Sequence, residues 1–175
     1  RDRWDPHIDV SAGGRSSLLS ASETMRLLRS LDDPDPDYAE APVNLRHRTE
    51  HKRFKLLVDA IDEEFSCSCE HDDHMEDSAE LGRIVIPETV LDSPARIVIS
   101  ISDFGRMTIV ALENPAAWSD AETAELMAVS DRNRIENALG RLGYIHISED
   151  PLDDPYDGEF DWPSTWRDRF FEEYI

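Results

Sequence analysis

Cysteine, glycine and lysine are all scarce in this chain of 175 residues. Only 2 residues are cysteine and 7 are glycine, and nearly all of the 18 basic residues are arginine. The two cysteines, Cys67 and Cys69, are one residue apart, where a disulfide would be strained, and we therefore predict a reduced, cytoplasmic setting. No apolar run approaches the ~18–20 residues that a membrane-spanning helix needs. No phosphate-binding loop or nucleophile-elbow motif occurs, so we expect binding rather than catalysis.

Acidic residues are what the chain has in excess. It holds 39 Asp and Glu against 18 Lys and Arg, a formal net charge of −21. This charge argues against general nucleic-acid binding and against docking to anionic membranes, because both need Lys and Arg. Residues 1–55 contain ten acids and ten bases, so the excess lies in residues 56–175. It is densest in 56–82, with ten acids and no Lys or Arg, and in 149–161, with seven acids and no base.

Composition divides the chain into two parts. For residues 1–47 we predict an N-terminal arm, a short helix over 20–31 and a linker in which Pro and Asp repeat. Residues 48–175 have the apolar periodicity of a folded domain. We therefore expect an N-terminal extension followed by one acidic domain.

Within residues 48–175 the period of the apolar residues alternates between helical and extended. The clearest signal is a β-hairpin, in which two β-branched runs flank a short loop around Gly105. We expect helices at 49–65, at 120–142 with an interruption near Ser130-Asp131, and from 164 onward, and strands at 65–69, 83–86, 96–101, 107–112 and 144–148. Short links between consecutive strands predict an α+β fold, with a mainly antiparallel four- to five-stranded sheet and two to four packed helices.

The densest group of metal-binding residue types is Cys67, Cys69, His71 and His74. Thiolate and imidazole ligands suit Zn²⁺, so this cluster predicts a zinc site in a metal-binding protein or metal-dependent enzyme. All four residues fall within eight positions, however, whereas structural zinc sites usually draw on two separated pairs. If 65–69 is a strand, both cysteines are instead small core residues, and no cofactor is needed.

Two acidic segments, 70–80 and 149–161, are candidate contact surfaces for a basic protein. Aromatic residues follow the second segment, so we expect aromatic anchors with an acidic rim, although aromatics at helical spacing are also typical of a core. Acidity could equally be a solubility trait without any partner. The predicted partner-binding residues are Asp72, Asp73, Asp150, Asp153, Asp154, Asp157, Glu159, Asp161, Trp162 and Trp166.

Several short motifs between Phe54 and Ile175 carry a family resemblance. They are Gly82-Arg83-Ile84-Val85-Ile86-Pro87, Asp131-Arg132, Ile135-Glu136-Asn137-Ala138-Leu139-Gly140, Gly143-Tyr144, Pro155-Tyr156-Asp157-Gly158, Ser164-Thr165-Trp166 and Arg169-Phe170-Phe171. In these motifs the chain resembles small acidic actinobacterial proteins associated with the immunity partners of polymorphic bacterial toxins. The resemblance implies a non-enzymatic inhibitor whose acidic surface blocks a basic toxin. Its motifs are structural, so it assigns no functional residue.

Overall fold

The computed structural model describes residues 17–34, 45–72 and 79–171. Two helices precede a run of four strands, and helices and one more strand follow, which is the segregated order expected of an α+β chain. In chain order they are α1 (Ala21–Leu31), α2 (Leu45–Phe65), β1 (Glu70–Asp72), β2 (Glu80–Ile86), the 3₁₀ helix η2 (Glu88–Val90), β3 (Ile97–Ser102), β4 (Met107–Leu112), α3 (Asp120–Leu126), α4 (Val129–Leu142), β5 (Ile145–His146), the 3₁₀ helix η3 (Asp150–Asp153) and α5 (Trp166–Phe170).

The five strands form one sheet in the order β1-β2-β3-β4-β5. The first three pairs are antiparallel, and β5 lies parallel to β4. The parallel pair follows from the connection, because α3 and α4 lie between β4 and β5 and return the chain to the end where β4 began. The predicted mainly antiparallel sheet is therefore confirmed, with one parallel pair at its edge.

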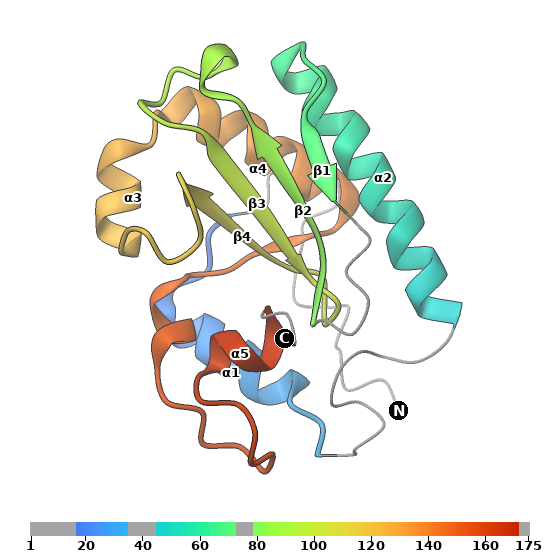
Figure 1. Cartoon of the computed structure of the whole chain (residues 1–175), viewed down its shortest axis with the longest axis vertical. Helices are drawn as coiled ribbons and strands as arrows, with labels where there is room; N and C mark the ends of the chain where they lie inside the picture. Colours follow the sequence, from blue (N-terminus) through green and yellow to red (C-terminus); the bar gives the residue numbers. More distant parts are fainter. Residues whose placement is uncertain (1–16, 35–44, 73–78, 172–175) are drawn as a thin grey trace.

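Helices α2 and α4 cover one face of the sheet and lie behind it in Figure 1. The apolar stripe predicted for 49–65 is the buried side of α2, with Phe54, Leu57 and Ile61 all fully buried. They pack on side chains that alternate along β3, such as Ile97 and Ile99. This layer forms the larger of two hydrophobic cores.

The opposite face carries a second core, built by α1, η3 and α5. Leu28 from α1, Leu152 from η3 and Phe170 from α5 are fully buried there against Ile109 of β4. Because both faces are covered, every residue of β3 and β4 is buried. Helix α1 contributes to this core, so a boundary at residue 47 does not separate it from the rest of the fold.

Local capping signals explain where several helices begin and end. Ser119 forms a capping box with Glu122 at the start of α3, as the sequence predicts. Gly143 ends α4 with a φ of 75°, the left-handed conformation that glycine adopts at little cost. Among the described residues, no helix combines the length and apolarity that crossing a membrane requires.

One predicted strand and one predicted helix cap are wrong. Residues 65–69 are a turn and an extended link rather than a strand, because Ser66 takes a φ of 50° and β1 begins only at Glu70. The last helix begins at Trp166, one residue after its cap Thr165, because Thr165 and Asp168 form the capping box in place of Ser164. Alternating small residues in 65–69 resemble a strand, but none of the strand pairings among the described residues includes them.

Candidate functional site

The acidic segment 149–161 lies at one end of the molecule, beside α1 and α5 (Figure 1). Its backbone is fixed at its start and at its middle. Tyr156 N–H donates to the Ser164 carbonyl at 3.0 Å, and Pro155 pairs with Thr165 as an isolated bridge. The Asp120 carboxylate accepts the N–H groups of Glu149 and Asp150 at 2.9 and 3.1 Å. The segment is therefore an ordered loop clamped to α3 and α5.

Arg167 forms ion pairs with two of the loop carboxylates. Its Nη1 donates to Glu149 Oε1 and its Nε donates to Asp153 Oδ1, both at 3.0 Å. Glu149 is 6% exposed, and burial raises its pKa although Arg167 and the Ala116 N–H work in the opposite direction. Arg167 thus serves as an internal counter-charge for the loop.

Arg169 is fully buried, as is Asp131 among the other charged residues that the structure describes. Its side chain is 0% exposed, and its Nε donates to Asp32 Oδ1 at 2.8 Å. Its guanidinium carbon lies 4.8 Å from the ring centroids of Phe104, Phe160 and Phe170, within cation–π range. Asp32 follows α1, so this pair fastens α1 to α5.

Tyr156 shares the same carboxylate. Its hydroxyl donates to Asp32 Oδ2 at 2.6 Å, and burial together with this bond raises the pKa of Tyr156 to about 12. The neutral Tyr156 hydroxyl therefore anchors the loop to Asp32 as a third contact.

The loop still presents charge to solvent. Asp150, Asp153 and Asp157 are exposed but engaged: Asp150 accepts the Asp120 N–H, Asp153 pairs with Arg167, and Asp157 takes a two-point ion pair from Arg29 at 2.9 and 3.0 Å. Three further carboxylates are exposed, and within the described residues no cation pairs with them. These are Asp154, Glu159 and Asp161.

The two predicted tryptophan anchors differ in position. Trp162 is half-buried next to Phe160, with ring centroids 6.4 Å apart. Trp166 is 1% exposed and packs on Phe170 and Tyr156 inside the second core. Trp166 as a surface anchor is therefore wrong, because the helical spacing of the aromatics points it inward.

The second predicted surface lies elsewhere. Asp72 is exposed on β1, at the sheet edge beside α2, whereas the loop at 149–161 lies at the end with α1 and α5 (Figure 1). Asp73 is outside the described residues. Of the predicted contact residues in this segment, only Asp72 is described, and it lies on β1 rather than beside the 149–161 loop.

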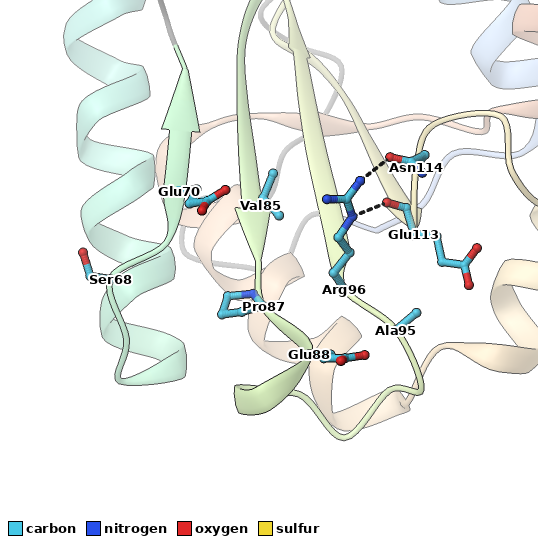
Figure 2. Close-up of a pocket in the computed structure, with 9 residues that line it drawn as sticks. All are labelled: Ser68, Glu70, Val85, Pro87, Glu88, Ala95, Arg96, Glu113 and Asn114. Carbon is cyan, nitrogen blue, oxygen red and sulfur yellow. Dashed lines mark hydrogen bonds between the residues drawn. The ribbon is translucent and has the colours of Figure 1, made fainter.

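A pocket of about 640 Å³ opens at the β1 side of the sheet (Figure 2). Three exposed glutamates line it: Glu70 of β1, Glu88 of η2 and Glu113 after β4. The one lining cation is Arg96, whose Nε and Nη2 donate to the Glu113 carbonyl and to Asn114 Oδ1. The lining is therefore net acidic and favours cationic over anionic groups.

The cysteines form a cluster beside that pocket, with Ser68 between them lining it. The Sγ atoms of Cys67 and Cys69 are 3.3 Å apart, and an oxygen of Asp62 completes a set of three atoms that all lie within 4.8 Å of one another. His71 is exposed on β1 and is not part of this set, and His74 lies outside the described residues. Asp62 was not predicted, although it stands one turn before the end of the helix that precedes the cysteines.

A partly buried group of charged side chains lies at the β3–β4 turn. Glu50 pairs with Arg106 at 3.3 Å and with Arg53 at 3.6 Å, and Arg53 Nη1 donates to the Leu142 carbonyl. Burial, assisted by Glu50, raises the pKa of Asp103 to about 7. These contacts join α2, the hairpin and the end of α4.

When the chain is compared with protein-family models, with curated proteins and with solved structures, no match is found. The resemblance to toxin-immunity proteins stays a prediction. The function has to be argued from the residues and their geometry.

Proposed function

We propose that this protein is a non-enzymatic binding domain that engages a basic protein through the ordered acidic loop at 149–161. The observation that carries the proposal is the combination of a clamped loop with exposed carboxylates. A binding surface that is already ordered loses little conformational entropy on association. Exposed charges of one sign steer a partner of the opposite sign.

The charge balance of the loop supports a cationic partner. Seven acids lie in 149–161, and two arginines from outside the segment, Arg29 and Arg167, pair with three of them. Asp154, Glu159 and Asp161 are left facing solvent at the surface. Lys and Arg side chains of a partner would complete this partial neutralisation.

Phe160 and Trp162 alternate with the acids along the chain and supply apolar area. Both are half-buried, and Phe160 is braced by Arg169 beneath it. An aromatic side chain held by the fold, with carboxylates around it, is typical of an interface anchor with a polar rim. Trp162 takes the role that the sequence assigned to it together with Trp166.

The finer proposal is an immunity-type inhibitor. A toxin that acts on nucleic acid has a basic cleft, and an acidic loop of this kind could occupy that cleft in place of the phosphate backbone. The resemblance named from the sequence motifs and the surface charge support this reading together. Such an inhibitor needs no catalytic residue of its own.

The product of the neighbouring gene is the partner to test first, because immunity proteins are expected beside their toxin. We would measure association and dissociation rates of the full chain with that protein at several salt concentrations. We expect the association rate to fall with salt, and to fall by about 10-fold or more in the triple variant Asp154→Asn, Glu159→Gln, Asp161→Asn.

A matched control has the same change in charge at exposed acids away from the loop, namely Asp59→Asn, Glu63→Gln, Glu125→Gln. This control should keep most of the association rate. Equal losses in both triple variants, or binding that ignores salt, would refute the loop as the contact surface. Failure of any basic neighbour to bind would leave acidity as a solubility trait.

A further inference from the structure

The turn at the end of α2 folds the two cysteines back over the helix. Ser66 adopts a left-handed φ of 50°, and the Cys67 N–H then donates to the Asp62 carbonyl at 3.1 Å. The Cys69 N–H donates to Asp62 Oδ1 at 2.8 Å. Two backbone hydrogen bonds thus position one carboxylate against both thiols.

The three side chains offer a ligand set of suitable size for one metal ion. The sulfurs are 3.3 Å apart, and the Asp62 oxygen lies within 4.8 Å of both. In a tetrahedral zinc site with Zn–S distances of ~2.3 Å, two sulfurs lie roughly 3.8 Å apart. A small rotation of the Cys67 side chain, which is half-buried and on the outer side, would reach that spacing.

Electrostatics give the cluster a reason to bind a cation. Two sulfurs and a carboxylate lie close together here, and Cys69 is only 5% exposed. Ionising both thiols would place three negative charges side by side, which is unfavourable unless a cation is bound. A divalent ion would replace the thiol protons and stabilise both thiolates.

We propose that Asp62, Cys67 and Cys69 form a three-ligand site for a thiophilic divalent cation of the zinc type, with a fourth position open to solvent. The site differs from the set read from the sequence, because Asp62 enters it and His71 does not. It stands apart from the acidic loop and does not depend on the proposed function. Three protein ligands and one open position are the pattern of zinc sites that bind a further small ligand.

Cobalt is a direct probe, because tetrahedral thiolate-bound Co²⁺ has an intense visible spectrum and a sulfur-to-metal charge-transfer band. We would titrate the reduced full chain with Co²⁺ and then displace the ion with Zn²⁺ in competition with a chromophoric chelator. One equivalent should bind with the tetrahedral signature. Absence of a stoichiometric signature in reduced protein would overturn the proposal.

Matched variants identify the ligands. Cys67→Ser and Cys69→Ser should each abolish the charge-transfer band or cut affinity at least 10-fold, and Asp62→Asn should weaken binding similarly while still accepting the Cys69 N–H. Asp59→Asn, an exposed acid on the same helix, is the control and should bind as the wild type does. Circular dichroism of each variant checks that it is folded.

Two outcomes would contradict the ligand set. If His71→Ala abolished metal binding and Asp62→Asn retained it, His71 rather than Asp62 would be a ligand, as the sequence alone predicts. A Cys67–Cys69 disulfide in protein purified under mild conditions, detected by mass after alkylation, together with no metal binding after reduction, would replace the metal site by a redox pair. Neither outcome depends on whether the 149–161 loop binds a partner.

Discussion

The ion pair between Arg169 and Asp32 should be the most costly polar contact to break in this fold. The two side chains are 0% and 9% exposed, and they join α5 to the end of α1. Arg169→Met keeps the unbranched apolar stem of the side chain but removes the guanidinium, with its charge and its contacts to the rings of Phe104 and Phe170. Asp32 would then be left as a buried carboxylate with only the Tyr156 hydroxyl as a described partner.

Removing one member of a buried ion pair costs about 3–5 kcal/mol of unfolding free energy, since the remaining charge stays buried without compensation. A domain of this size is stable by about 5–15 kcal/mol, so Arg169→Met should fold but with little reserve. Adding Asp32→Asn removes the orphaned charge. The double variant should therefore lose less than the sum of the two single variants, by about 2 kcal/mol or more.

Urea unfolding followed by tryptophan fluorescence measures these free energies for the wild type, both single variants and the double variant. Arg29→Gln serves as control, because its ion pair with Asp157 is exposed and should contribute little. A loss below about 1 kcal/mol in Arg169→Met, or strict additivity in the double variant, would refute the buried-pair argument.

Two further predictions concern single side chains. The pKa of Asp103 is about 7 in the fold against 3.8 for the free group, so the folded chain keeps a proton that the unfolded chain has lost between these pH values. The unfolding free energy should therefore fall by on the order of 4 kcal/mol as pH rises from 3.8 to 7. Asp103→Asn should remove this part of the pH slope in urea titrations at several pH values, and an unchanged slope would contradict it. Trp166→Ala should lower the unfolding free energy by about 3–5 kcal/mol, because it leaves a cavity in the second core. Trp162→Ala should lower the unfolding free energy much less and should weaken partner binding instead. Equal losses of unfolding free energy in the two variants would contradict this placement of the two side chains.

The accuracy of the sequence reading follows the range of the interactions involved. The hairpin around Gly105 and the capping box at Ser119 are set by neighbouring residues, and both are present. The strand predicted at 65–69 is absent, because alternating small residues are compatible with any extended link. Whether such a link becomes a strand depends on a hydrogen-bonding partner that lies far away in sequence.

For the candidate sites too, features set by neighbouring residues are visible in the sequence and features set by distant residues are not. The acidic loop is visible as seven acids in thirteen residues, but its order is not, since its clamps come from Asp120, Arg167 and Asp32. Asp62 entered the cysteine cluster through a left-handed residue at Ser66, for which the sequence holds no glycine as a signal. Trp166 is a predicted anchor because it borders the acidic segment, but spacing shows only which aromatics share a face and not which way that face points.

Composition and local pattern alone determined that the chain is acidic, α+β and built around a mainly antiparallel sheet, because charge counts and apolar periods are properties of adjacent residues. Only the tertiary structure decided that α1 belongs to the core and that β5 runs parallel to β4. It also decided which carboxylates are already paired and which face solvent. Each of these depends on contacts between residues distant in sequence, whose free energy comes from burial and from the pairing of buried charges rather than from local propensity.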